Sequence, residues 1–308
     1  GLYGKGNAGM TEKSPLVSIL LPTYNSERYI REALDSLLSQ SYPNLEVVIS
    51  DDASSDGTQE ILREYEEQFP GVIRLYLQDK NLGVTRNCNF ILKRCRGEFI
   101  LFFAGDDFLY KNCISESVAA MQDGGHAMAF HNHDFVDEFS KKIRQKDKRY
   151  KGHTANLFRL IKTGVYVKCN GMMARTKHLP EQGYDESLKY SSDFDFVFRI
   201  LGSDNSYIFI DQTLSAYRKH SESLTVRKRN VCLLDSSEVY LRLIKKYPKY
   251  SFFISRHVSN AFRSSRFSNA NGYEYRDWLV ASIGAFQFNI SAWFALFVNA
   301  LSFGRIRL

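Results

Sequence analysis

Short apolar runs alternate with helix-like segments over the first third of the chain, and this alternation limits the fold more than any other feature. The apolar runs span 16–21, 45–50, 72–77 and 99–103. The segments between them, 26–40, 58–68 and 84–95, repeat apolar residues at helical spacing. Such alternation favours right-handed crossovers between parallel strands. The sequence therefore predicts an α/β fold with a mainly parallel sheet flanked by helices.

Polar residues follow three of these runs, at the points where the strands are predicted to end. They are Thr23, Tyr24 and Asn25 after the first run, Asp51 and Asp52 after the second, and Asp106 and Asp107 after the fourth. Ligands of open parallel sheets bind beyond the carboxyl ends of the strands, so these groups are candidates for one site. The first two groups also have a structural interpretation, because Asn and Ser cap helices and Asp stabilises turns.

The pair Asp106 and Asp107 is the hardest of the three groups to explain by structure alone. Two adjacent ionised carboxylates repel each other, and removing them from water is costly unless a cation or hydrogen-bond donors compensate them. The run that precedes them, 99–104, is apolar enough that we expect its end to be buried. We therefore expect a positively charged group to bind at this strand end.

Composition limits the class of protein and its surroundings. The 308 residues are 44% apolar and 24% charged, as in a globular protein with one sizeable domain and an appendage. We interpret the Gly-rich residues 1–9 as a cloning remnant. No basic leader precedes an early apolar stretch, and the cysteines lack metal-ligand spacing, so we expect a cytoplasmic location. The net charge of +7 suits a membrane surface or a diphosphate-bearing substrate better than nucleic acid.

Four motifs follow one another in the order and spacing that is typical of a known family. They are residues 17–25 (VSILLPTYN), 48–58 (VISDDASSDGT), 81–84 (NLGV) and 97–107 (GEFILFFAGDD). Over residues 15–110 the chain resembles glycosyltransferase family 2. The resemblance implies a GT-A fold, a nucleotide-sugar donor, a divalent cation and transfer with inversion at the anomeric carbon.

The family pattern assigns nucleotide contacts to the first two strand ends. By this resemblance, the base and ribose are bound by Pro22, Thr23, Tyr24 and Asn25. Asp52, with Asp51 beside it, can accept a hydrogen bond from a base N–H such as uracil or thymine presents, so we expect a UDP-sugar, with a dTDP-sugar as the alternative. Arg86 lies near the start of a predicted helix and can meet phosphate there, although it fits an ordinary surface residue equally well.

The same resemblance assigns a cation, Mn²⁺ or Mg²⁺, to the fourth strand end. Asp107 is expected to ligate the metal and Asp106 to contact ribose or a metal-bound water, with ligation by Asp106 as the alternative. A cation that bridges both phosphates stabilises the charge on the leaving group and needs only one or two protein carboxylates. Ala104 stands where many members carry a further acidic residue, so the choice between the two ligands stays open.

Two motifs in the second half resemble later parts of the family pattern. Asp193, in the run 189–200, aligns with the catalytic base that takes the proton of the acceptor hydroxyl. It also fits a helix N-cap, with Asp195 as an acid in the first turn. In the run 214–223, His220 aligns with a group that reaches the metal or the donor diphosphate, and Arg218 with one that offsets charge in the active site.

After residue 226 the family pattern ends and helical periodicity takes over. We therefore divide the chain into a GT-A domain, 10–226, and a helical region, 227–308, with helices expected at 231–247 and 252–267. Residues 278–303 carry no charge but are interrupted by polar side chains, which favours interfacial helices over a full span. We expect 278–308 to contact the inner face of the cell membrane, which suggests a lipid-linked saccharide acceptor in surface-glycan assembly. Packing on the catalytic domain or on a second subunit is the alternative.

Two other functions share part of this pattern. A sugar nucleotidyltransferase also holds a metal with strand-end carboxylates, but it needs a Gly-rich, basic phosphate loop after the first strand, which residues 22–25 do not provide. A non-catalytic nucleotide- or carbohydrate-binding protein would use the same pocket without a base. Replacing Asp193 by Asn separates the two, because an enzyme should keep donor binding and lose transfer.

Overall fold

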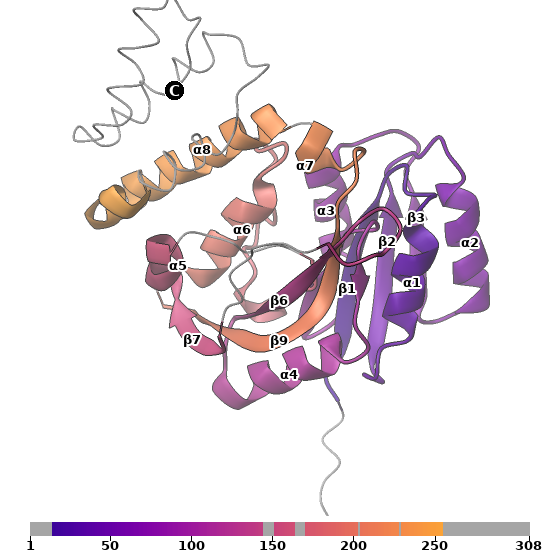
Figure 1. Ribbon diagram of the computed structural model, residues 1–308, viewed down its shortest axis with the longest axis horizontal. Helices are drawn as coiled ribbons and strands as arrows, with labels where there is room; N and C mark the ends of the chain where they lie inside the picture. Colours follow the sequence, from indigo (N-terminus) through magenta and orange to yellow (C-terminus); the bar gives the residue numbers. More distant parts are fainter. Residues whose placement is uncertain (1–13, 144–150, 164–169, 203, 228, 255–308) are drawn as a thin grey trace, which may run out of the picture.

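The computed structural model describes residues 14–143, 151–163, 170–202, 204–227 and 229–254. Its strands form one sheet with helices on both faces, as Figure 1 shows. The helix expected at 252–267 lies mostly outside the described residues, and the segment 278–308 lies wholly outside them. Within the described ranges, no helix is long and apolar enough to cross a bilayer.

The alternation predicted for the first third of the chain is confirmed. Its elements are β1 (Val17–Thr23), α1 (Ile30–Leu38), β2 (Leu45–Asp51), α2 (Thr58–Gln68), β3 (Ile73–Leu77), α3 (Val84–Leu92) and β4 (Phe99–Phe102). The first helix begins later than predicted, because residues 26–29 form a turn in which the N–H groups of Tyr29 and Ile30 both donate to the carbonyl of Ser26 at 2.9 Å.

The rest of the described chain adds short strands, two long strands and further helices. These elements are β5 (Phe108–Leu109), α4 (Cys113–Gly124), β6 (Met128–Val136), β7 (His153–Asn156), α5 (Leu157–Thr163), β8 (Met173–Arg175), α6 (Ser192–Leu201), β9 (Ser206–Arg218), α7 (Leu224–Arg227) and α8 (Arg229–Lys246). Short 3₁₀ turns span Thr176–His178 and Pro248–Tyr250. The helix expected at 231–247 is confirmed as α8.

The strand order places the functional ends of the strands along one edge. The order is β3–β2–β1–β4–β8–β6–β9–β5, and β7 pairs with β9. β1 to β4 are parallel, β8 is antiparallel to both β4 and β6, and β6 is parallel to β9. Because two antiparallel pairings separate β4 from β6, the strands β6 and β9 point the same way as β1 to β4. The carboxyl ends of β1, β2, β4, β6 and β9 therefore meet at one edge of the sheet.

Each face of the sheet carries its own hydrophobic core, because successive side chains of a strand point to opposite faces. In β1, Ile19 and Leu21 pack with side chains of α1, α2 and α4. Leu20 belongs instead to the core formed with α3, α5 and α6. This second core also contains Val239 and Leu243 of α8. Helix α8 is therefore packed against the sheet in the same core as α6.

Candidate active site

The carboxyl edge of the sheet brings together residues predicted from the ends of β1, β2, β4 and β9. Thr23 lies opposite Asp51 in the register of β1 and β2, and its Oγ1 donates to Asp51 Oδ2 at 3.0 Å. Asp106 Oδ2 lies 3.0 Å from Nε2 of His220, although 114 residues separate them in the sequence. The fold thus joins the motifs of the two halves of the chain in one polar edge.

The first strand end presents two exposed residues, one of which has a left-handed backbone. Tyr24 is 52% exposed and lies directly after β1, whose residue Pro22 is partly buried. Asn25 adopts a positive φ of 49°, and its Oδ1 accepts a hydrogen bond from the N–H of Ser55 at 2.9 Å. The amide of Asn25 therefore fixes the loop after β2, and the Tyr24 ring is the group of this stretch that is free to contact a base.

The two carboxylates after β2 are buried and shape the loops around this edge. Asp51 accepts hydrogen bonds from the Ser54 hydroxyl at 2.5 Å and from Gln59 Nε2 at 2.9 Å. Asp52 accepts from the N–H groups of Leu82 at 2.6 Å and Gly83 at 2.9 Å. An ionised carboxylate has about four lone-pair sites, so Asp52 keeps acceptor capacity for a base N–H.

Gly83 and Arg86 define the start of α3 beside this loop. Gly83 has a φ of +86°, a conformation that strains residues with a side chain, and this geometry lets its N–H reach Asp52. Arg86 is exposed, and its Nε lies 3.2 Å from Glu186 Oε2. An exposed ion pair of this kind contributes little free energy, so it leaves Arg86 available to a phosphate.

The two carboxylates after β4 have different surroundings. Asp107 is 2% exposed, and its Oδ1 accepts a hydrogen bond from the N–H of Arg218 at 2.7 Å. The side chain of Asp106 is 33% exposed and pairs with His220. The pair therefore offers one carboxylate fixed inside the edge and one at its surface.

His220 has the surroundings of a metal ligand. Its ring packs on Tyr29 with centroids 4.7 Å apart, and its buried Nδ1 has no hydrogen-bond partner among the described residues. When Nε2 carries the proton and donates to ionised Asp106, Nδ1 presents the lone pair by which neutral imidazole binds metals. In this arrangement Nδ1 and the oxygen of Asp106 that contacts Nε2 lie on different sides of the ring, so they would not ligate the same ion. The carboxylates of Asp106 and Asp107 are the oxygen ligands that Mn²⁺ and Mg²⁺ prefer.

The protein supplies only part of the coordination that such an ion needs. In the described part of the chain, no group of three or more His, Cys, Asp or Glu side chains is arranged to hold an ion. Mg²⁺ and Mn²⁺ in phosphate-transferring sites commonly take one or two protein carboxylates and complete their coordination with substrate phosphates and water. The residues present therefore fit a cation that binds together with a diphosphate.

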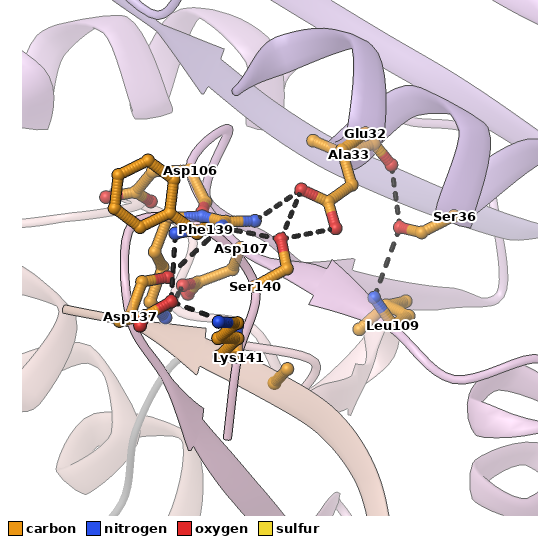
Figure 2. Close-up of polar contacts among 12 residues, drawn as sticks. Glu32, Ala33, Ser36, Asp106, Asp107, Leu109, Asp137, Phe139, Ser140 and Lys141 are labelled. Carbon is orange, nitrogen blue, oxygen red and sulfur yellow. Dashed lines mark hydrogen bonds and ion pairs between the residues drawn. The ribbon is translucent and has the colours of Figure 1, made fainter. Parts of the chain in front are cut away.

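Arg218 fixes the end of β9 through buried hydrogen bonds. It is 1% exposed and donates to Asp106 O at 2.7 Å, to Ser140 Oγ at 2.9 Å and to Glu32 Oε2 at 2.6 Å. Figure 2 shows Glu32, Ser140 and the Asp106–Asp107 turn gathered around this point. The positive charge of the guanidinium is thus paired with Glu32 on α1, and its N–H groups join three segments of the chain.

Asp193 lies in the first turn of α6. Ser191 is the N-cap, so the alternative that makes Asp193 the N-cap is wrong. Its Oδ1 accepts a hydrogen bond from the N–H of Phe194 at 2.7 Å. Burial raises the pKa of the Cys88 thiol to about 12, and the negative charges of Asp193 and Asp52 add to that shift. Cys88 of α3 therefore lies close to both the predicted base and the predicted nucleotide contact.

Further hydrogen bonds join α3 to the start of α6. The hydroxyl of Thr85 donates to the carbonyl of Leu188 at 2.8 Å and lies 3.1 Å from the hydroxyl of Ser192. The first turn of α3 thus contacts the Asp52 loop on one side and the segment that carries Asp193 on the other. The predicted base and the predicted nucleotide contacts are therefore positioned through the same helix.

Asp235 of helix α8 holds the segment before Asp193, a contact that the sequence does not predict. Asp235 Oδ2 accepts hydrogen bonds from the N–H groups of Tyr190 at 2.6 Å and Ser191 at 3.3 Å. The hydroxyl of Ser191 donates to the carbonyl of Cys232 at 3.0 Å, also on α8. The sequence of this region shows only helical periodicity. That pattern predicts α8 itself, but it does not predict that Asp235 contacts the start of α6.

Known proteins of similar sequence are glycosyltransferases. An uncharacterized glycosyltransferase of Rickettsia typhi is 28% identical over 268 residues, which cover 84% of this chain and 82% of the relative. The putative teichuronic acid biosynthesis glycosyltransferase TuaG of Bacillus subtilis is 36% identical over 121 residues, 39% of this chain and 48% of the relative.

Solved structures share the fold at lower identity. S. aureus TarS 1-349 in complex with UDP has a TM-score of 0.69 and 22% identity, and the match covers 88% of this chain and 80% of that one. The mannosyltransferase PcManGT from Pyrobaculum calidifontis, in complex with GDP-Man and Mn²⁺, has a TM-score of 0.60 and 16% identity over 95% of this chain and 86% of that one. The expected GT-A type of α/β fold is confirmed.

The family model described as Glycosyl transferase family 2 matches residues 18–180, more than half of the chain. This match runs from β1 through the Asp106–Asp107 turn and past β8, so it includes four of the five strand ends that form the edge described above. A nucleotidyltransferase and a non-catalytic binding protein, the two alternatives, are both disfavoured by it and by the glycosyltransferase relatives. The chain is a glycosyltransferase and belongs to glycosyltransferase family 2.

Proposed function

We propose that this glycosyltransferase moves a sugar from a UDP-sugar to a hydroxyl of a saccharide acceptor, with a dTDP-sugar as the second candidate donor. The observation that carries the proposal is the single strand edge that joins Thr23, Asp106 and His220, with Asp193 reached through α3. Among the similar solved structures, TarS binds UDP or UDP-GlcNAc and the mannosyltransferase binds GDP-Man. These complexes support a nucleotide-sugar donor.

On the donor side, we propose that Asp107 and His220 hold Mn²⁺ or Mg²⁺, with Asp106 as the alternative carboxylate ligand. When bound, such a cation offsets the negative charge that develops on the leaving nucleoside diphosphate. The Mn²⁺ of the mannosyltransferase complex supports this assignment. Arg218 positions the Asp106–Asp107 turn, because its main-chain N–H donates to Asp107 Oδ1 and its Nε donates to the main-chain carbonyl of Asp106.

On the acceptor side, Asp193 acts as the general base. Its carboxylate takes the proton of the acceptor hydroxyl while that oxygen bonds to the anomeric carbon from the face opposite the diphosphate. Attack from that face inverts the configuration of the sugar. The hydrogen bond from the N–H of Phe194 to Oδ1 holds this carboxylate at the first turn of α6.

The acceptor and the location are proposed from the sequence and from relatives. One similar protein is a putative teichuronic acid biosynthesis glycosyltransferase, which supports a role in cell-surface polysaccharide assembly. We propose a lipid-linked saccharide acceptor, a cytoplasmic location and peripheral contact of residues 278–308 with the inner face of the cell membrane. That segment lies outside the described residues.

A donor panel tests the proposal. The purified protein is heated with UDP-glucose, UDP-galactose, UDP-N-acetylglucosamine, GDP-mannose or dTDP-glucose, each with Mn²⁺ and each with EDTA. We expect a UDP- or dTDP-sugar to raise the melting temperature with Mn²⁺ and to do so less with EDTA, because a ligand that binds only the folded state stabilises it. The proposal fails if no nucleotide sugar shifts the melting temperature or is turned over.

Replacing Asp193 by Asn tests the base. Because general bases contribute about 100- to 10,000-fold to rate, we expect Asp193→Asn to lose transfer by that factor while its dissociation constant for the donor stays within about twofold of the wild-type value. Asp211→Asn, the same change at an exposed position of β9, serves as the control and should alter neither quantity. Full transfer activity in Asp193→Asn would remove it as the base.

A further inference from the structure

The turn that follows β6 holds an aromatic side chain in solvent. Phe139 is 70% exposed, the largest value among the exposed large apolar side chains of the described residues. A single exposed apolar residue on a loose loop needs no explanation. Phe139 differs because hydrogen bonds hold the turn that carries it. We call residues 137–141 the 137–141 turn.

Hydrogen bonds within the turn fix its backbone. Asp137 Oδ1 accepts from the N–H of Phe139 at 2.9 Å and from the N–H of Lys141 at 3.0 Å. Ser140 adopts a positive φ of 63°, which is uncommon for a residue with a side chain. Its hydroxyl donates to Glu32 at 2.9 Å and accepts from Arg218 at 2.9 Å. Backbone strain of this kind persists only where surrounding contacts enforce it, and it clusters at binding sites.

The same contacts connect the 137–141 turn to the candidate active site. The guanidinium that binds Ser140 also donates to the carbonyl of Asp106. The guanidinium of Arg28 lies 5.8 Å from the Phe139 ring centroid and 5.3 Å from that of Tyr29, and the Tyr29 ring contacts His220. The exposed ring is therefore fixed next to the edge that is proposed to hold the donor diphosphate.

We propose that Phe139 is a platform on which a pyranose ring of the substrate packs. This inference rests on the proposed function, because it names a substrate contact of the same site. One face of a pyranose presents mainly C–H bonds, and the negative face of an aromatic ring attracts such groups while excluding water from them. The hydroxyls at the rim of the sugar then need polar partners, and the turn offers them in the ion pair of Arg28 with Glu138 and in the ammonium of Lys141.

The surroundings of Phe139 favour a sugar over a lipid surface. Membrane anchoring needs a broad apolar area, whereas Phe139 is one ring between the charged residues Arg28, Glu138 and Lys141. A small apolar face with a few convergent polar groups is the composition of a small-molecule subsite. The pyranose can belong to the donor or to the acceptor, and binding measurements distinguish these sources.

Three variants of Phe139 separate the ring from its bulk. Phe139→Ala removes the side chain, Phe139→Leu keeps apolar volume without a ring, and Phe139→Trp keeps an aromatic face. Phe252→Ala, the same truncation at an exposed ring in the segment after α8, serves as the control. Melting temperatures within about 2 °C of the wild-type value are expected for all four, because exposed side chains contribute little to stability.

Binding is measured for the donor and the acceptor separately. Calorimetry with Mg²⁺ gives dissociation constants for UDP, UDP-glucose, UDP-galactose and UDP-N-acetylglucosamine. Saturation-transfer NMR with UDP and Mg²⁺ reports contacts to methyl glucoside, methyl galactoside and methyl N-acetylglucosaminide, and Mg²⁺ is used because Mn²⁺ broadens the signals. An aromatic contact predicts an affinity loss of about 3- to 10-fold in Phe139→Ala and Phe139→Leu, with Phe139→Trp near the wild-type value.

Loss of affinity for a UDP-sugar with unchanged affinity for UDP supports the platform and assigns it to the donor sugar. Unchanged nucleotide affinities with a lost methyl-glycoside signal support it and assign it to the acceptor. The proposal is overturned if Phe139→Ala loses affinity equally for UDP and for the UDP-sugars, or if its binding of every sugar is unchanged. It is also overturned if the variant loses only its binding to anionic lipid vesicles. If the wild-type protein binds no nucleotide sugar, the proposed function fails, and the methyl-glycoside measurements still decide the role of Phe139.

Discussion

At the scale of single residues, the Asp106–Asp107 pair divides into two unequal carboxylates. Asparagine keeps the oxygen that accepts from the Arg218 N–H, so Asp107→Asn removes charge while it preserves that contact. If Asp107 ligates the cation, its Asn variant should bind UDP in Mn²⁺ no better than in EDTA. Asp106→Asn should still bind UDP more tightly in Mn²⁺ than in EDTA, but by a smaller factor than the wild-type protein. Calorimetry of UDP with Mn²⁺ and with EDTA measures both, and the reverse order of the two variants would assign the metal to Asp106.

The sequence predicts that residues named by a motif gather at one edge, but it does not predict contacts that depend on a distant partner. The edge formed by Thr23, Asp51 and the Asp106–Asp107 pair follows from strand ends that the apolar pattern already locates. Arg218 was placed at the site, but its partner Glu32 lies 186 residues away and was not predicted. Ser140 was not singled out, because its role comes from a left-handed backbone and contacts that no local pattern encodes.

At the scale of elements, α8 positions the start of α6. The carboxylate of Asp235 accepts from the N–H groups of Tyr190 and Ser191, directly before the turn that carries Asp193. Removing it leaves these N–H groups unpaired and lets the first turn of α6 move. We therefore expect Asp235→Ala to lower kcat by roughly 10- to 100-fold, as small misplacements of a reacting group do, with the donor dissociation constant unchanged. Steady-state kinetics and calorimetry with the donor test this separation.

Two further variants make the test of Asp235 specific. Asp235→Asn keeps one acceptor oxygen for the N–H groups and should recover most of the lost kcat, which a general loss of stability would not do. Lys245→Ala changes an exposed residue of the same helix and should have no effect. A donor affinity that falls together with kcat in Asp235→Ala would mean that α8 supports the whole pocket, not the base.

The elements themselves were predictable from periodicity where they are long and local. The alternation of β1 to β4 with α1 to α3 and the helix α8 fall within a few residues of their predicted bounds. β5 and β7 were not predicted, because strands of two and four residues carry too few side chains to show a period. β9 was not predicted either: its pairing with β6 shifts register around Asn132, and irregular pairing weakens the alternation on which prediction relies.

At the scale of the whole molecule, one sheet separates two cores and gathers the site at its carboxyl edge. The face that carries α1 holds Arg218 and the 137–141 turn through Glu32. The other face carries α3 and α6, and with them Asp193. The predicted metal ligands are therefore supported from one face and the predicted base from the other, whereas the Asp52 loop is held by the start of α3.

Thermal unfolding tests whether the region after residue 226 is a separate unit or part of the catalytic unit. Leu243 of α8 is 6% exposed within the core shared with α6, so Leu243→Ala should cost about 2–5 kcal/mol and lower the melting temperature by roughly 5–15 °C. If α8 is part of the catalytic unit, near-UV circular dichroism and calorimetry should show one transition, shifted as a whole, which UDP with Mg²⁺ still raises. Leu224→Ala, the same change at an exposed position of α7, should shift it by less than about 2 °C. If residues 227–254 were instead an independent appendage, Leu243→Ala would create a separate early transition and leave the nucleotide-sensitive one in place.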